Sequence, residues 1–209
     1  MDVSNPLRAI APGVEGDVLA ALVRTHAPLT GARAARLADR SETQVREVMR
    51  RLEAQGLVRS ERHGNSSIYV LNREHLLAEA VGLLASAADR AEGAIRELVA
   101  GWAAQPAAVA LFGSFARRDG GPDSDVDILL VRPDPIDEDN DVWVAQRHAL
   151  SRQVEAWTGN HVQILELSEA ELHEARRRDE PLVESLRTDG VVLVGGLALA
   201  TSNAGLSAR

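Results

Sequence analysis

The sequence predicts an α+β protein: a front part of short helices and a hairpin, a long linker helix, and a mixed sheet with flanking helices. Apolar residues at helical spacing dominate the first half, and short apolar runs bounded by turn residues, typical of strands, recur in the second. Charge divides the chain too. Residues 1–72 hold ten Arg against eight acidic residues (+2), and residues 73–209 hold thirteen against twenty-three (−10), which predicts two modules.

Composition narrows the class of protein. The 209 residues include no cysteine, which excludes disulfides and thiolate metal sites. The N-terminus lacks a basic start and an apolar core, so we expect no signal peptide, and no apolar run is long enough to span a bilayer. We therefore predict a cytoplasmic protein without membrane contact. Its acidic back half does not attract nucleic acid, whereas the front half can do so locally.

The front part begins with two predicted helices. Apolar residues at helical spacing predict a helix over 16–26, which Pro28 ends. Thr30 is placed to cap a second, short helix that runs through Leu37.

A third helix and a hairpin complete this part. Ser41 and Gln44 form a capping-box pair at the start of the third helix, and Gly56 ends it. Two strands are predicted at 57–62 and 67–71. Three helices followed by such a hairpin have the layout of a winged helix-turn-helix, which we assign to residues 1–72.

The face of the third helix opposite its buried stripe is predicted to bind double-stranded DNA. Helical geometry places Thr43, Arg46, Glu47 and Arg50 on this face, where a recognition helix enters the major groove. We expect Arg46 and Arg50 to bind guanine edges or phosphates, and Thr43 and Gln44 to read bases. The acidic Glu47 on the same face opposes an interpretation as phosphate binding alone. The hairpin adds residues for contacts to the backbone or minor groove: Arg59, Arg62, His63 and Asn65. Residues 43–71 resemble MarR- and ArsR-like bacterial regulators, in particular where Gly-Leu-Val runs into the hairpin. A protein-interaction domain with a solvated charged face is the alternative.

A single helix is predicted from about 73 to 102. Eight residues along it alternate at spacings of four and three, as in a coiled-coil seam: Leu77, Val81, Leu84, Ala88, Ala91, Ile95, Leu98 and Trp102. We predict that this seam, within a linker at 73–105, forms a homodimer. Packing of the stripe on the protein's own sheet is the alternative.

Two Asp residues and a Gly-Ser turn form the most informative segment. Residues 107–112 predict a strand, Gly113 and Ser114 break it, and a short helix follows at 115–118. Asp125 and Asp127 open the next apolar run, so they share one face of a strand at 126–131. Two like charges this close call for a divalent cation. A surface turn would explain residues 120–123 but not acidic residues on one face of a strand.

This segment resembles the signature of DNA-polymerase-β-like nucleotidyltransferases, and most closely the minimal nucleotidyltransferases. The matching elements are Gly113-Ser114, a gap of about ten residues, and Ser124-Asp125-Val126-Asp127 before an apolar strand. The resemblance covers residues 106–196 and implies a polymerase-β-like nucleotidyltransferase fold. It implies Asp125 and Asp127 as catalytic and metal-binding residues, with Mg²⁺ or Mn²⁺ as cofactor. An NTP, as substrate or ligand, would be held by Gly113, Ser114, Arg117 and Ser124.

The remaining elements complete the sheet. Helices are predicted at 141–157 and 181–188, strands at 161–167 and 191–194, and a capping box at Ser168 and Glu171 starts a further helix. Residues 197–209 are small and polar, which predicts a disordered tail.

The third strand departs from the resemblance. The nucleotidyltransferases that this segment resembles have a third carboxylate on this strand, whereas Gln163 occupies the aligned position in this sequence. An amide carries no charge and accepts no proton from an attacking hydroxyl. Glu166, three residues on, points the other way on a regular strand. Nucleotide binding is therefore better supported than catalysis.

We predict a DNA-binding transcriptional regulator. Its nucleotidyltransferase domain binds Mg-NTP and transfers an NMP group to a hydroxyl or protein acceptor. Two alternatives stay open. The domain is inactive and serves as a nucleotide sensor or dimerisation module, or the protein is an antitoxin-type minimal nucleotidyltransferase with a toxin as its partner.

Overall fold

The computed structural model describes residues 1–25, 27–64 and 66–197, in two compact units divided between Arg90 and Ala91. In the described part of the chain, no helix has the length and apolar character needed to cross a membrane. The predicted disordered tail falls outside these residues except for Leu197, which is buried in the core of the second unit. For Leu197 the prediction of disorder is wrong.

The described residues of the first unit form short helices and a small antiparallel sheet. The helices are η1 (Pro6–Ala9), α1 (Val14–Arg24), α2 (Gly31–Ala38), α3 (Glu42–Ala54) and α4 (Leu76–Ala85). The strands are β1 (Leu29–Thr30), β2 (Val58–His63) and β3 (Ser66–Leu71), in the order β1-β3-β2. The three predicted helices and the hairpin are present. The two-residue β1, which pairs with Tyr69 and Ile68 of β3, was not predicted.

Local sequence signals set the boundaries in this unit. The Thr30 side chain caps α2, and Ser41 and Gln44 form the predicted capping box at the start of α3. Gly56 follows α3 with φ +78°, the left-handed conformation that glycine adopts without strain. Val45, Val48 and Met49 of α3 pack in the core, which fixes the face of α3 that is exposed.

The prediction of one helix from 73 to 102 is wrong. The structure has α4 and then α5 (Ala87–Ala100), separated at Ser86, whose hydroxyl donates to the Leu83 carbonyl at 3.1 Å. Such a side-chain bond to the backbone competes with helix continuation. Val81 and Leu84 pack on the core of the first unit, whereas Trp102, beyond the end of α5, packs edge-on against Trp143 in the second.

The predicted seam is thus divided between two cores of the same chain. Ile95 is fully buried, and Leu77 is 52% exposed. The homodimer stays a prediction, but this stripe of residues does not provide a continuous surface for it.

The second unit is built on a four-stranded mixed sheet. Its strands are β4 (Ala108–Phe112), β5 (Val126–Arg132), β6 (Val162–Ser168) and β7 (Val191–Gly195), in the order β6-β5-β4-β7. β5 and β6 are parallel, and the β4–β5 and β4–β7 pairs are antiparallel. The helices are α6 (Gly113–Arg117), α7 (Asp141–Thr158), α8 (Glu169–Arg177) and α9 (Pro181–Asp189). The predicted short helix at 115–118 therefore begins two residues earlier, directly after β4.

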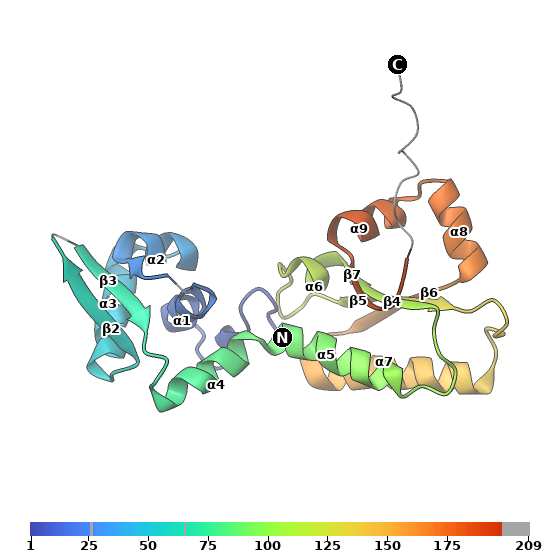
Figure 1. Ribbon diagram of the computed structural model, residues 1–209, viewed down its shortest axis with the longest axis horizontal. Helices are drawn as coiled ribbons and strands as arrows, with labels where there is room; N and C mark the ends of the chain where they lie inside the picture. The colour runs from blue at the N-terminus through green and yellow to red at the C-terminus, as the bar shows by residue number, and fades with distance from the viewer. Residues whose placement is uncertain (26, 65, 198–209) are drawn as a thin grey trace, which may run out of the picture. The chain divides into compact units, whose positions relative to one another are not determined.

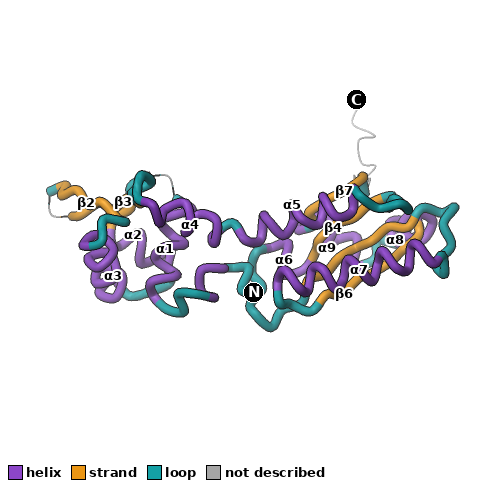
Figure 2. Tube along the Cα trace, turned by 90° about the horizontal axis from the view of Figure 1, so that it is seen from below, coloured by secondary structure: helices purple, strands orange, loops and turns teal. Residues whose placement is uncertain are grey.

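Helices cover both faces of this sheet. Figure 1 shows α5 and α7 along one face and α8 and α9 along the other; Figure 2 views the same arrangement from the side of α5 and α7. Leu129 and Val131 of β5 pack on Leu172 and Leu186 of α8 and α9. Because side chains alternate along a strand, Asp127 lies on this same face, near the start of β5.

Candidate functional site

Asp125 and Asp127 lie where the end of β4 meets the start of β5. Asp125 directly precedes β5, and Asp127 is the antiparallel partner of Phe112, the last residue of β4. Gly113 follows with φ +66°, and a Cβ added there would stand 2.3 Å from Oδ2 of Asp127. The Asp127 carboxylate therefore lies directly against the Gly113 backbone, which leaves room for glycine alone.

The two carboxylates influence each other electrostatically. Partial burial and the charge of Asp125 raise the pKa of the Asp127 carboxyl above its usual value, and the positive charge of Arg117 opposes this effect. A cation placed between the carboxylates would relieve the repulsion. Among the described residues, no group of three Asp, Glu, His or Cys side chains is placed to hold a metal. Two carboxylates nevertheless fit Mg²⁺, which is commonly bound by one or two carboxylates together with water and phosphate oxygens.

Gln163 of β6 completes this cluster. It is the parallel partner of Asp127, and its side-chain amide donates to Oδ2 of Asp125. The position aligned with the family's third carboxylate is thus next to both Asp residues. An amide N–H here engages one Asp125 oxygen without supplying negative charge, so the site has two carboxylates where three would hold two metals.

Glu166 does not replace the missing carboxylate. Its side chain lies on the other face of β6, where Arg132, Arg147 and the indole N–H of Trp143 all donate to it. Burial alone would raise the pKa of the Glu166 carboxyl, but these hydrogen bonds outweigh burial and lower it. As expected from strand alternation, Glu166 points away from Asp125.

Asn160 supports the loop that carries Asp125, a role that the sequence pattern does not predict. Its buried side-chain amide donates to the carbonyls of Ser124 at 2.9 Å and Pro122 at 3.2 Å. The Ser124 hydroxyl accepts from the Gly121 N–H at 3.0 Å, so Ser124 shapes the same loop. Asn160 follows α7, and its hydrogen-bond partners lie more than thirty residues earlier in the sequence, so no local pattern predicts this role.

Ser114 and Arg117 lie on α6. The Ser114 carbonyl accepts from the N–H groups of Asp119 at 3.1 Å and Gly120 at 3.3 Å, which turns the chain after the helix. The Arg117 guanidinium, predicted to face phosphate, is paired with Asp119 at 3.0 Å and Asp189 at 3.5 Å. These pairs raise the pKa of Arg117, with the Asp119 hydrogen bond as the largest cause.

Part of the chain is similar to a known kind of domain. Residues 92–187 match the nucleotidyltransferase domain family. The match begins inside α5, upstream of the start predicted at 106, and includes all the carboxylates of the site. No curated protein sequence matches the chain.

Two solved structures are similar to part of the chain. One is described as a toxin–antitoxin with AMP-PNP, with 22% identity over 50% of this chain and 73% of the other, at a TM-score of 0.35. The second is a mutant of the toxin–antitoxin MntA-HpeT, with 20% identity over the same shares and a TM-score of 0.36. At these scores, neither likeness adds to what the nucleotidyltransferase domain match itself provides.

A second candidate site lies outside the nucleotidyltransferase domain, on α3. The predicted residues Thr43, Gln44, Arg46 and Arg50 are all exposed. The Gln44 side-chain oxygen accepts from the Ser41 backbone at 3.3 Å and its hydroxyl at 2.9 Å, which leaves the amide N–H groups for another partner. Arg46 pairs weakly with Glu42 at 3.4 Å.

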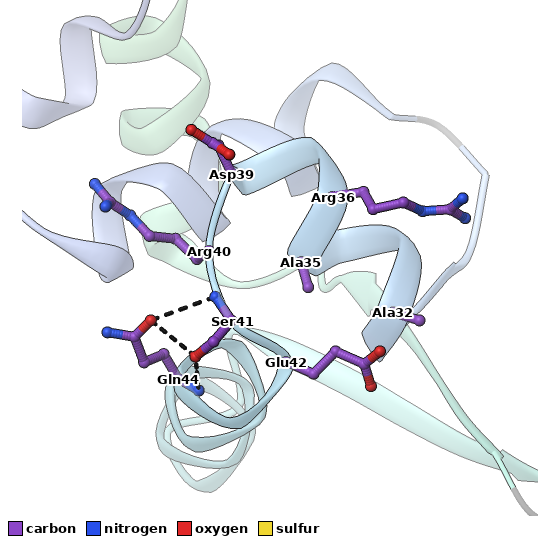
Figure 3. Close-up of a pocket in the computed structure, with 8 residues that line it drawn as sticks. All are labelled: Ala32, Ala35, Arg36, Asp39, Arg40, Ser41, Glu42 and Gln44. Carbon is purple, nitrogen blue, oxygen red and sulfur yellow. Dashed lines mark hydrogen bonds between the residues drawn. The ribbon is translucent and has the colours of Figure 1, made fainter.

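A pocket of polar character opens between α2 and the start of α3. Figure 3 shows the residues that line it, with Arg36 and Arg40 directed to opposite sides and Gln44 turned back to Ser41. Arg36 and Arg40 were not among the predicted DNA contacts. Arg36 adds positive charge beside the exposed face of α3, whereas the guanidinium of Arg40 is paired with Asp17 at 2.7 Å.

The hairpin carries the rest of the predicted contacts. Arg62 and His63 are exposed at the end of β2. Arg59 is exposed as well, but its guanidinium is paired with Glu74. Asn65 lies outside the described residues.

Proposed function

We propose that the protein is a DNA-binding transcriptional regulator whose nucleotidyltransferase domain binds a Mg²⁺-nucleoside triphosphate. The observation that carries the nucleotide part is the pair Asp125 and Asp127, of which Asp127 lies against the backbone of Gly113. Mg²⁺ held by these carboxylates would bring the nucleotide phosphates beside the turn at Gly113 and Ser114. The bound metal would supply neutralisation of phosphate charge, and Arg117 is near enough to add to it.

Gln163 favours a domain that binds the nucleotide but transfers its NMP group inefficiently. Transfer requires activation of an acceptor hydroxyl, and the amide of Gln163 accepts no proton from one. The domain would then sense a nucleotide. Transfer of an NMP group to a hydroxyl or a protein side chain is the second candidate, favoured by the retained pair of Asp residues.

Calorimetry tests the nucleotide site. Wild type should bind at least one of the four NTPs in the presence of Mg²⁺. Asp125→Asn combined with Asp127→Asn should weaken binding by at least about tenfold, because the metal loses both charged ligands. Asp123→Asn, an exposed neighbour in the same loop, is the matched control and should change little. If neither wild type nor the double variant shows a binding signal with any NTP, the proposed site is wrong.

The DNA-binding part of the proposal rests on the exposed face of α3. The capping box at Ser41 sets where this helix begins, and the buried residues Val45, Val48 and Met49 set which face is exposed. Arg46 and Arg50 project from this face at the helical spacing that meets one groove of a duplex. The hairpin of β2 and β3 would contact the DNA backbone beside it. The net positive charge of residues 1–72 is consistent with this use.

Arg46→Ala combined with Arg50→Ala should lower affinity for a duplex taken from upstream of the protein's own gene. If both contact phosphates, the slope of log K against log salt should fall in magnitude by about 1.8. Arg51→Ala removes an arginine of the same helix that pairs with Glu15, and it is the control. Fluorescence anisotropy at several salt concentrations measures both quantities. If both the affinity and the slope of the double variant equal those of wild type, α3 is not the DNA-contacting helix.

A further inference from the structure

Arg117 links the candidate nucleotide site to the end of α9. It is the last residue of α6, one helical turn after Gly113, and its charge acts on Asp127. Its guanidinium is nevertheless engaged by two other carboxylates, Asp119 in the turn after α6 and Asp189 at the end of α9.

The sheet places Asp189 at this end of the domain. Asp189 is followed by Gly190 and then by β7, whose first residue, Val191, is paired with Leu111 of β4. Leu111 precedes Gly113 by two residues, so α9 ends beside the turn that begins α6. α6 and α9 are in contact.

An acidic residue at the end of α9 is electrostatically unfavourable for the helix itself. The C-terminus of a helix carries partial negative charge and favours cations. Arg187 in the same last turn is directed to Asp179 at 2.7 Å, whereas Asp189 meets Arg117. Asp189 and Gly190 form a turn dipeptide before β7, but the partner of the Asp189 carboxylate, Arg117, lies beside the candidate nucleotide site.

The ion pair is also easy to break. Arg117 and Asp189 side chains are 40% and 26% exposed and stand 3.5 Å apart. Solvent-exposed pairs of this kind contribute little to stability. A nucleotide triphosphate carries several negative charges close together and would compete effectively for the guanidinium.

We propose that Asp189 competes with a bound nucleotide for Arg117, so that the carboxylate at the end of α9 limits the affinity of the site. The inference rests on the proposed nucleotide binding and adds a residue that sets its strength. When the nucleotide binds, Arg117 exchanges Asp189 for phosphate oxygens, and the ion pair between α6 and the end of α9 is broken. Asp119, in the same turn as Arg117, can remain paired.

The test measures the dissociation constant of the Mg²⁺-NTP that wild type binds best. Asp189→Asn should tighten binding about two- to fivefold, the range that the strength of an exposed ion pair allows. Arg117→Ala should weaken binding, and Asp189→Asn should have no effect in the Arg117→Ala background. Asp123→Asn controls for general removal of negative charge near the site. Thermal unfolding of each variant checks that the fold is retained.

The possible results distinguish competition for Arg117 from nucleotide binding itself. If Asp125→Asn/Asp127→Asn abolishes binding but Asp189→Asn binds like wild type, competition for Arg117 is overturned and the nucleotide site stands. Equal tightening by Asp189→Asn with and without Arg117 would also overturn it, since the effect would then be one of general charge. If neither wild type nor any variant binds an NTP, the proposed nucleotide site is wrong, and the competition for Arg117 is overturned with it.

Discussion

Gln163→Glu is expected to raise the rate of NMP transfer from Mg²⁺-NTP by about 100-fold or more, the lower end of what a positioned acid–base group contributes. The change replaces the amide nitrogen that donates to Asp125 with a carboxylate oxygen, without altering the length of the side chain. It would place a third carboxylate beside Asp125 and Asp127. Deprotonation of the acceptor hydroxyl should then limit NMP transfer less, because the new carboxylate next to Asp125 and Asp127 can accept the proton of the hydroxyl.

We also expect Gln163→Glu to change the thermal stability of the protein in a way that depends on Mg²⁺. Without a divalent cation, three neighbouring carboxylates repel one another, so the Gln163→Glu melting temperature should fall. Added Mg²⁺ should raise it more than it raises that of wild type. Single-turnover assays with labelled NTP measure the rate. Gln163→Ala, which removes the amide without adding charge, should show neither gain. A Mg²⁺-stabilised Gln163→Glu variant with an unchanged rate would mean that the third carboxylate is not what limits transfer.

Local signals explain why much of the fold could be predicted. The capping box of Ser41 and Gln44 and the glycine at 56 act within a few residues, so the sequence alone places both ends of α3. The same holds for Asp125 and Asp127, because alternation along one strand puts both on a single face. Each of these predictions depends on chemistry within one element.

The failures involve partners distant in sequence. The apolar spacing of α4 continues into α5, so periodicity alone carries no sign that the stripe is divided between two cores. Asn160 reaches a loop more than thirty residues earlier, and Arg117 pairs with Asp189 with a separation of 72 residues. Only the strand order β6-β5-β4-β7 brings these residues together. Positions of this kind follow from topology and not from local pattern.

Asp17→Asn is expected to destabilise the first unit by about 2–4 kcal/mol. Asp17 is 3% exposed, and its carboxylate accepts from Arg40 at 2.7 Å, Arg8 at 2.8 Å and Asn5 at 2.9 Å. It therefore joins α1 to the segment before it and to the turn between α2 and α3. The two arginines are partly exposed and can hydrate when the charge is removed, which keeps the cost below that of an isolated buried charge.

The effect of Asp17→Asn should depend on pH. Burial by itself raises the pKa of the Asp17 carboxyl, but the hydrogen bonds from Arg40, Arg8 and Asn5 outweigh it and lower the pKa. A lowered folded-state pKa gives stability that is fully present above the unfolded value, about 3.9, and is lost as the pH falls through the folded value. The difference between wild type and Asp17→Asn should thus be largest near neutral pH and shrink below about pH 4.

Hydrogen exchange of α1 and α3 amides measures this difference in the first unit. All three tryptophans lie at or after position 102, so tryptophan fluorescence reports on the second unit, where Asp17→Asn should have no effect. Glu15→Gln is the control on the same helix. Glu15 has one arginine partner, Arg51, and both side chains are exposed, so its loss should cost about 0–1 kcal/mol. An equal cost for the two substitutions, or a cost for Asp17→Asn that persists unchanged at pH 2, would show that the buried carboxylate does not hold α3 in place.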